Sequence, residues 1–323
     1  MIEVGGRYIS LDKKCHQSEI DFVSHAHTDH ISAVKKSNGV IMSAETASLI
    51  KTAYNIAPKL CEINTRTLGI SMLDSGHMLG AKQLFVEQEG MQSIVYTGDF
   101  TLQQLEIPKK IEIPKSDIVV IYSTYPYMEI KFNDREFYID KMISWINKML
   151  SKGIVLFSAY AMGKAQELNY IMNENSIIPI VSPKIARINS VYGDAGINLI
   201  YDTYQAEEHM RGNFVGIVET RDIRALAFKL SCIHKKVVYS AIASGFAAFM
   251  HFNTDAQFPI SDHADFNQSM DYINQTGARE VFTYGHNKDI FAKNLKAHGY
   301  AAVPFCNILK PLHTTPILKE TVC

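Results

Sequence analysis

The stretch Ser24-His25-Ala26-His27-Thr28-Asp29-His30 determines how the rest of this chain is interpreted. It places three imidazoles and one carboxylate within six residues, directly after the apolar segment Ile20–Val23. Imidazole and carboxylate together suit zinc or a similar first-row cation. His25 and His27 can reach one ion from a turn, whereas Asp29 and His30 can reach a second. The pattern predicts a metal site, and a histidine-rich surface loop is the simpler alternative.

Two further candidate ligands follow in the first third of the chain. His77 lies in the segment Asp74–Gly80, and Asp99 lies in the segment Tyr96–Phe100. Each follows a strand-like run and has a glycine directly before it, which allows a sharp turn. Because the ends of neighbouring strands meet at one rim of a sheet, we expect both side chains to join the metal site.

The order of these motifs, H-x-H-x-D-H, then G-H, then T-G-D, resembles that of the metallo-β-lactamase fold. The resemblance implies an α/β protein with a four-layer αββα sandwich. This fold carries lactamases, thioesterases, lactonases and nucleases, so the fold alone does not define the function.

Size and composition define the broad class of protein. The 323 residues suit two domains, and the net charge of −1 argues against a large non-specific nucleic-acid footprint. Bound dications or a local patch can still attract a polyanion. The five cysteines are scattered and lack C-x-x-C spacing, which favours a reducing cytoplasm. The first residues predict a hairpin around Gly5-Gly6 and no signal peptide, and no apolar run is long enough to span a bilayer. We therefore expect a cytoplasmic protein with no membrane partner.

The pattern of expected elements changes near residue 125. Before that point there are many short strands, with a helix capped by Ser43 and a hairpin over 82–86 and 93–96. After it, helices and strands alternate, which is typical of a parallel-sheet unit. From about residue 260 a helix, a strand and a helix would complete the first domain. We therefore expect an inserted domain, with these limits: core 1–124, cap 125–258 and completing core 259–323.

Four segments of the chain resemble motifs of the β-CASP branch of the fold. This branch comprises metal-dependent nucleases with a cap domain inserted in the hydrolase core. The resemblance is closest to the short prokaryotic and archaeal members, which are related to RNA 3′-end cleavage factors and ligase-associated exonucleases. The segments are Tyr122–Tyr125 (Y-S-T-Y), Ser158–Leu168 (S-A-Y-A-M-G-K-A-Q-E-L), Phe258–Phe266 (F-P-I-S-D-H-A-D-F) and Val281–His286 (V-F-T-Y-G-H).

The resemblance implies two Zn²⁺ ions, or another divalent metal, and a role for each motif residue. Asp29 would orient a hydroxide that bridges the ions, and His263 would protonate the leaving 3′ oxygen as general acid. Lys164 and Ser261 are candidate phosphate contacts, and a solvated lysine and a helix-capping serine are the simpler interpretations. The implied metal ligands are His25, His27 and His77 for one ion, Asp29, His30 and His286 for the other, and Asp99 between them.

Two departures from the family pattern concern catalysis. Tyr122 stands where the family has an acid that hydrogen-bonds the motif histidine. Tyrosine carries no charge at neutral pH, so His263 would be a weaker acid unless Asp262 or Asp265 substitutes. The family usually reads H-G where this chain reads Gly285-His286, and a one-residue shift along a strand reverses the facing side. If the shift falls in the loop beyond Tyr284, His286 can still reach the metal.

The sequence therefore predicts a nuclease that hydrolyses single-stranded RNA, by endo- or exonucleolytic cleavage. A DNA exonuclease of the ligase-associated type is the first alternative, because that group shares the phrasing of Phe258–Phe266. A catalytically weakened paralogue that binds RNA is the second. A small-molecule hydrolase would not need the cap. A homodimer is possible.

Overall fold

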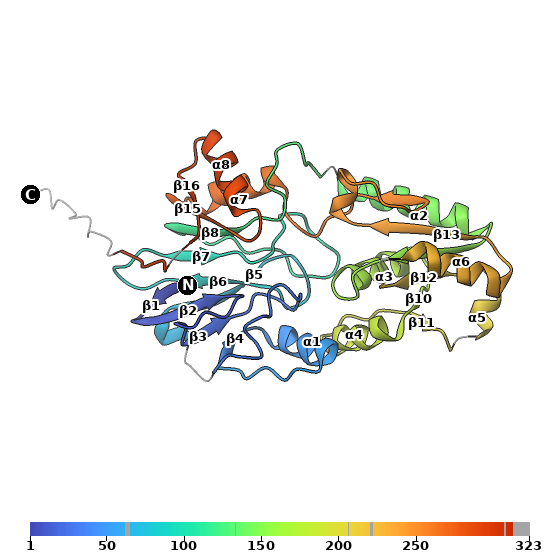
Figure 1. Cartoon of the computed structure of the whole chain (residues 1–323), viewed down its shortest axis with the longest axis horizontal. Coiled ribbons are helices and arrows are strands. Elements are labelled where there is room, and N and C mark those ends of the chain that lie inside the picture. Colours follow the sequence, from blue (N-terminus) through green and yellow to red (C-terminus); the bar gives the residue numbers. More distant parts are fainter. Residues whose placement is uncertain (62–64, 133, 206, 220–221, 307, 313–323) are drawn as a thin grey trace, which may run out of the picture.

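Two β-sheets pack face to face in the part of the molecule drawn on the left of Figure 1. The computed structural model describes residues 1–61, 65–132, 134–205, 207–219, 222–306 and 308–312. The first sheet has the order β1-β2-β3-β4, with β1 (Ile2–Val4), β2 (Arg7–Leu11), β3 (Ile20–Phe22) and β4 (Val40–Ile41). The second has the order β16-β15-β8-β7-β6-β5, with β5 (Ile70–Asp74), β6 (Lys82–Val86), β7 (Ile94–Tyr96), β8 (Ile118–Tyr122), β15 (Glu280–Tyr284) and β16 (Ala302–Pro304).

Helices cover the outer face of each of these sheets. Apolar side chains such as Ile9, Leu84 and Val120 fill the space between the sheets. Helix α1 (Ala44–Tyr54) packs through Leu49 and Ile50 on the first sheet. Helices α7 (Phe266–Thr276) and α8 (Lys288–Ala297) pack on the second sheet, and Figure 1 shows them on its far side from β1–β4. These layers are α, β, β and α, so the predicted α/β class with a metallo-β-lactamase-type sandwich is confirmed.

A long segment interrupts the second sheet. Strands β8 and β15 pair in parallel, with Tyr122 opposite Tyr284, although the residues are far apart in sequence. The chain between them builds a third sheet of six parallel strands, seen on the right of Figure 1. Its order is β11-β10-β12-β9-β13-β14, with β9 (Ile154–Ser158), β10 (Ile180–Val181), β11 (Asp202–Thr203), β12 (Val215–Val218), β13 (Val238–Ala243) and β14 (Ala256–Phe258). We refer to residues 125–258 as the cap segment.

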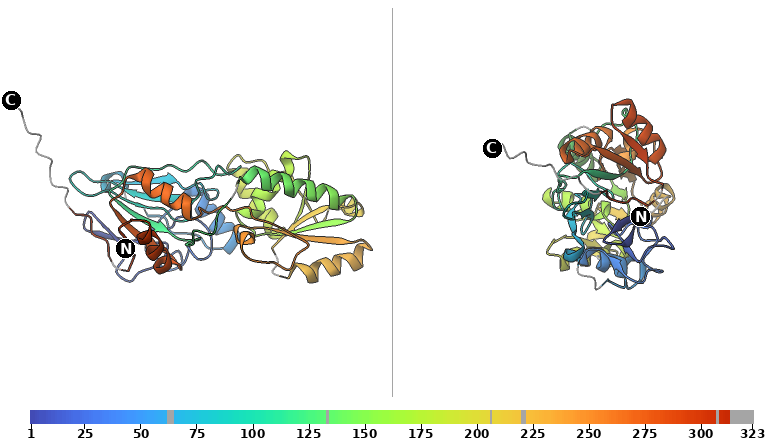
Figure 2. Two further views of the ribbon diagram at one scale, coloured as in Figure 1. Left: turned by 90° about the horizontal axis from the view of Figure 1, so that it is seen from above. Right: turned by 90° about the vertical axis from the view of Figure 1, so that its left-hand side faces the viewer.

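Helices accompany the third sheet, as expected for a parallel sheet whose strands are buried on both faces. Strand β9 is an almost wholly buried apolar run. The view from above in Figure 2 shows helices on both sides of this sheet and the cap segment beside the two core sheets. The helices are α2 (Arg135–Leu150), α3 (Lys164–Glu174), α4 (Pro183–Asp194), α5 (Glu207–Arg211) and α6 (Ile223–His234).

Local sequence signals begin and end several of these helices. Ser43 accepts a hydrogen bond from the Thr46 backbone N–H at the start of α1, as the sequence predicts. Ser182 caps α4, and Pro183 occupies its first turn, where a missing N–H costs nothing. Gly277 ends α7 in the left-handed conformation. The hairpin of β1 and β2 turns at Gly5-Gly6, and the hairpin of β6 and β7 is also as predicted.

Helix packing joins the cap segment to the core, and the chain re-enters the core after β14. Helix α1 of the core packs against α4, with Leu49, Ile188 and Tyr192 in one apolar cluster. The segment that leaves β14 returns to the core next to the metal-ligand candidates, where Ala264 N–H donates to the Phe100 carbonyl. Among the described residues, no helix combines the length and apolarity that a bilayer span requires.

Candidate metal centre

Six of the seven predicted ligands come from three loops that follow strands of the two core sheets. His25, His27, Asp29 and His30 follow β3, His77 follows β5, and Asp99 follows β7. The glycines before His77 and Asp99 have positive φ angles, of 78° at Gly76 and 54° at Gly98. A Cβ at Gly98 would lie 2.6 Å from the Cβ of Ser24, so only glycine allows this approach. The sharp turns that the sequence predicts therefore place the three loops together.

Four of these side chains form one close group. Single ligand atoms of His25, His27, His77 and Asp99 lie within 4.8 Å of one another. The His27 Nδ1 atom is 3.1 Å from His25 Nε2 and 3.3 Å from His77 Nε2. The Asp99 Oδ2 atom is 3.6 Å from His25 Nε2 and 3.9 Å from His77 Nε2. Zinc bonds of 2.0–2.2 Å give a tetrahedron with edges of roughly 3.4 Å, so this spacing suits one zinc ion.

A second, more open group shares Asp99 with the first. His30 Nε2 lies 3.5 Å from Asp99 Oδ2 and 3.4 Å from Asp29 Oδ2. His30 is buried, whereas the Asp29 side chain is 54 % exposed. His286 is exposed and lines a cleft that is described below. It belongs to neither cluster of potential ligands found among the described residues. The second group therefore has three candidate ligands in place, and the ligand role of His286 stays a prediction.

Unpartnered polar atoms indicate that a cation suits the centre. His30 Nε2 and Asp99 Oδ1 are buried and have no hydrogen-bond partner. Such atoms carry a desolvation cost unless a ligand satisfies them. Imidazole and carboxylate are the donor types that zinc takes, so the residues present fit the implied metal.

The pKa directions agree with this assignment. Burial, together with the neighbouring imidazoles, holds the pKa of His25 well below its usual value and lowers the pKa of His77 to about 3. These rings are therefore neutral at pH 7, which is the form that binds a metal. Burial also opposes the charging of His30, but Asp99 and Asp12 raise its pKa well above the usual value. The carboxylates thus favour a positive charge at this point, and a metal would replace the proton.

Hydrogen bonds fix the orientation of four of the five predicted imidazole ligands. Ser24 Oγ lies 3.0 Å from His25 Nδ1, and Asp12 Oδ2 lies 2.7 Å from His30 Nδ1. The backbone carbonyls of Met162 and Asp262 accept from His27 Nε2 at 3.2 Å and from His77 Nδ1 at 2.8 Å. Each ring therefore directs its other nitrogen toward the centre. Such partners set the tautomer and basicity of metal-bound histidine.

Asp12 is a candidate functional residue that lies outside the sequence motifs. It is 1 % exposed, has a φ of 58°, and also accepts from the Ser24 N–H and from the Tyr96 hydroxyl. An aspartate directly after the strand β2 was the available signal, because β2 neighbours β3 in the sheet. Its distance from the histidine motif in sequence concealed the contact.

His263 lies beside the metal centre and is held by two carboxylates. Its Nδ1 atom is 2.8 Å from Asp262 Oδ1, and its Nε2 atom is 3.1 Å from Asp99 Oδ2. Burial opposes the charged ring, but Asp262 and Asp99 raise the pKa of His263 to about 10. The sequence left open whether Asp262 or Asp265 supplies the carboxylate that pairs with His263, and in the structure this residue is Asp262. Asp265 instead caps α7 and accepts from the Gln268 N–H.

Tyr122 contacts a different histidine from the one the family pattern implies. Its ring centre lies 4.8 Å from that of His30. Within the described residues, Tyr122 and His263 share no hydrogen bond. Burial, and then the nearby carboxylates, raise the pKa of Tyr122, so the phenol stays neutral. Its catalytic role stays a prediction, with packing against a metal-ligand candidate as the observed contact.

The two candidate phosphate contacts are engaged in internal hydrogen bonds. Lys164 is 3 % exposed, and its Nζ atom bonds Glu167 and the Ile260 carbonyl. The Ser261 hydroxyl accepts from the His263 N–H at 3.0 Å and donates to the His263 carbonyl at 2.9 Å. Lys164 is therefore not a solvated lysine, and Ser261 does not cap a helix, so the simpler interpretations do not hold. Both residues instead shape the segment that carries His263.

A cleft of about 540 Å³ opens onto the centre between the core and the cap segment. Core residues line one side, and cap residues that include Tyr160 and Lys184 line the other. The Tyr160 side chain is 71 % exposed. This volume is within the range of pockets that hold small organic ligands. Core residues of the lining include His27, Asp29, Asp99, Tyr122, His263 and His286.

The chain is similar to curated proteins that are named as nucleic-acid enzymes. It is 25 % identical to a "Probable DNA ligase" of Opitutus terrae, over 87 % of this chain and 28 % of that protein. It is 23 % identical to "Probable RNase MJ4" of Methanocaldococcus jannaschii, over 53 % of this chain and 48 % of that protein. "Endoribonuclease YSH1" of Gibberella zeae is 32 % identical over 33 % of this chain and 13 % of its own length.

The chain thus spans less than half the length of these curated relatives. No protein-family model matches it. A solved structure of a protein of unknown function from Enterococcus faecalis has a TM-score of 0.62, with 11 % identity over 93 % of this chain and 83 % of that one. This likeness shows the fold and carries no information on activity.

Proposed function

We propose that this protein is a metal-dependent nuclease that hydrolyses phosphodiester bonds of single-stranded RNA. The observation that carries the proposal is the group of His25, His27, His77 and Asp99, whose spacing suits one zinc ion and whose Asp99 is shared with a second group. Three residues of this double group, His27, Asp29 and Asp99, line a cleft. Relatives named as ribonucleases support the choice of substrate.

The predicted metal ligands and the predicted acid each have a role in this proposal. His25, His27, His77 and Asp99 would hold one zinc ion, and Asp29, His30, His286 and Asp99 would hold a second. When bound, two such ions neutralise phosphate charge and lower the pKa of water. Asp29 is exposed to the cleft and would orient the attacking water. His263 would donate its Nε2 proton to the leaving oxygen, and the carboxylate of Asp262 keeps that proton on the ring.

The cap segment would be the domain that covers the substrate. We propose the limits 1–124 for the first part of the core, 125–258 for the cap and 259–323 for the completing part. The parallel pairing of β8 with β15 and the location of all strands of the third sheet between residues 154 and 258 support these limits. A polymer strand would enter between the cap residues Tyr160 and Lys184 and the core.

A DNA exonuclease is the second candidate function. The similarity to the "Probable DNA ligase" covers 87 % of this chain, more than the similarity to either ribonuclease described above. The same metal centre would serve either nucleic acid, because the scissile group is a phosphodiester in both.

End-labelled RNA and DNA strands, incubated with the pure protein with and without a chelator, test the proposal. Cleavage of RNA that stops on chelation is the expected result, and preferential cleavage of DNA would establish the second candidate. No cleavage of either strand by protein loaded with zinc would overturn both and favour the RNA-binding paralogue. Sedimentation of the same sample tests the proposed homodimer. The described cysteines Cys15, Cys61, Cys232 and Cys306 are free, in keeping with the proposed cytoplasmic location.

A further inference from the structure

Two buried cations of the cap segment converge on the segment 260–263 of the core. The Lys164 Nζ atom lies 3.2 Å from the Ile260 carbonyl oxygen and 3.6 Å from Asp262 Oδ2. The Arg135 guanidinium donates to the Ser261 carbonyl at 3.2 Å. Lys164 is 3 % exposed and Arg135 is 8 % exposed. Three consecutive core residues are therefore held by side chains from α2 and α3.

Carboxylates on both sides fix these cations. Glu167 of α3 bonds both Lys164 and Arg135. Glu106 of the core accepts two hydrogen bonds from Arg135, at 3.1 and 2.7 Å. The charges alternate from Glu106 through Arg135, Glu167 and Lys164 to Asp262. A buried charge has a high desolvation cost unless it is paired with an opposite charge. The network therefore favours the one arrangement of cap and core in which all five charges are paired.

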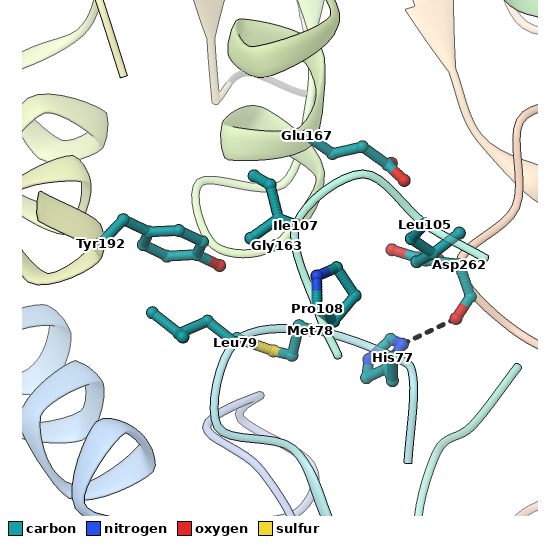
Figure 3. A pocket seen from close by; sticks show the side chains of 10 residues that line it. All are labelled: His77, Met78, Leu79, Leu105, Ile107, Pro108, Gly163, Glu167, Tyr192 and Asp262. Carbon is teal, nitrogen blue, oxygen red and sulfur yellow. Dashed lines mark hydrogen bonds between the residues drawn. The ribbon is translucent and has the colours of Figure 1, made fainter. Parts of the chain in front are cut away.

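The segment 260–263 connects the charge network to the candidate metal centre through contacts of Asp262. The Asp262 backbone carbonyl accepts the His77 Nδ1–H at 2.8 Å, which directs His77 Nε2 toward the centre. Figure 3 shows this hydrogen bond, with Glu167 on the helix above it. The Asp262 carboxylate lies 2.8 Å from His263 Nδ1. A movement of Asp262 would therefore change a predicted metal ligand and the predicted acid together.

The turn before α3 provides a second link between cap and metal centre. The Met162 carbonyl accepts from His27 Nε2 at 3.2 Å, which directs His27 Nδ1 toward the centre. Met162 is two residues before Lys164, so the anchoring of Lys164 also fixes this carbonyl. Of the three histidines in the first group, two are thus oriented through the cap or through the segment that the cap holds.

We propose that the cap segment completes the metal centre, and that Lys164 and Arg135 are positioning residues that act through Asp262 and Met162. The cap then sets the affinity for metal as well as access for the substrate. This role replaces the phosphate contact expected for Lys164. The identity of the metal as zinc rests on the proposed function.

Calorimetric titration with zinc ions, in the absence of nucleic acid, tests this proposal. The test protein is the full chain with Lys164→Met and Glu167→Gln, which removes one buried charge of each sign. The matched control carries Lys148→Met and Glu174→Gln, which are exposed residues of α2 and α3. The test variant should bind zinc about 10 to 100 times more weakly, the usual effect of losing a group that orients a metal ligand. The control should match the parent.

Steady-state cleavage provides a readout that a merely structural defect would not give. With saturating zinc, the test variant should show a reduced kcat and a KM close to that of the parent, because His263 is displaced while the cleft is kept. Lys164→Gln, which retains a hydrogen-bonding group, is the milder second variant and should shift zinc affinity in the same direction. Circular dichroism confirms that each variant is folded.

Parental zinc affinity in either folded Lys164 variant would overturn the proposal. The outcome is separate from that of the proposed function, because the titration needs no substrate. If the parent protein binds zinc but cleaves neither RNA nor DNA, the proposed nuclease function is refuted. The zinc titration of the variants then still decides whether the cap segment sets the affinity for metal. A parent that binds no zinc would overturn both.

Discussion

The two halves of the metal centre differ in how completely the fold prepares them. The ligand atoms of His25, His27, His77 and Asp99 lie within 4.8 Å of one another. In each of the three rings, the nitrogen that faces away from the centre makes a hydrogen bond. In the second half, by contrast, Asp29 beside His30 is exposed, and so is His286, which lies outside both clusters of potential ligands among the described residues. The ligand atoms of the first half are already close together without an ion, whereas the second half must bring exposed side chains together. We therefore expect the first half to bind its ion more tightly.

The largest effect is expected at the residue that the two halves share. Asp99→Asn removes one negative charge and one ligand from both groups, so both ions and all metal-dependent cleavage should be lost. Elemental analysis and cleavage of labelled RNA measure the two effects. Asp289→Asn, an exposed acid in the first turn of α8, is the control and should resemble the parent. Two retained ions in Asp99→Asn would refute a shared ligand.

The next largest effect is expected at the predicted acid. His263→Ala should lower kcat by about 100- to 10,000-fold, as for a lost general acid, because no other described imidazole is placed to take over its role. The metal content should be close to that of the parent, since His263 is in neither proposed ligand set. Single-turnover cleavage and elemental analysis are the measurements. A parental rate would require another proton donor.

A smaller effect should separate the two halves from each other. His286→Ala should weaken the second ion by at least about tenfold, comparable to the loss of a group that supports a metal site, and leave the first ion unchanged. Competition with a chelator resolves the two affinities. His251→Ala, another exposed histidine, is the control. If two ions still bind with parental affinity, His286 is not a ligand, and the G-H order in this chain has moved it away from the metal.

The smallest expected effect is a change in the pH profile. The carboxylate of Asp262 raises the pKa of His263 against the effect of burial, and the acid form of His263 is present only below that pKa. Activity therefore falls as pH rises through the pKa, and Asp262→Asn should move this fall toward lower pH, nearer to roughly pH 6.5. Tyr122→Glu should change the profile little, because Tyr122 contacts His30. A shift with Tyr122→Glu but none with Asp262→Asn would reverse the assignment.

The sequence predicted those features that depend on local pattern. The candidate ligands His25, His27, His77 and Asp99 could be selected because they lie in loops after strands and because glycine allows the turns at residues 76 and 98. The layers of the core followed from the same motifs. The structure has to add contacts between residues far apart in the chain, since no local pattern encodes them.

Asp12 and Lys164 illustrate this limit. Asp12 reaches His30 from a neighbouring strand, and nothing in the sequence around it indicates a metal site. Lys164 has the residue type of a phosphate contact, yet the fold buries it between Glu167 and Asp262. The residue type suggested a contact with phosphate, whereas in the structure the buried lysine contacts carboxylates of the protein itself. His286 shows the same limit, because its motif suggests a metal ligand although its side chain is exposed.

Crystals of the protein grown with zinc, with anomalous diffraction recorded at the zinc edge, test the central claim most directly. The account predicts two zinc peaks, both in contact with the Asp99 carboxylate. One would lie among His25, His27 and His77 at full occupancy, and the other beside Asp29 and His30. A single peak, or a pair of peaks that do not share Asp99, would contradict it.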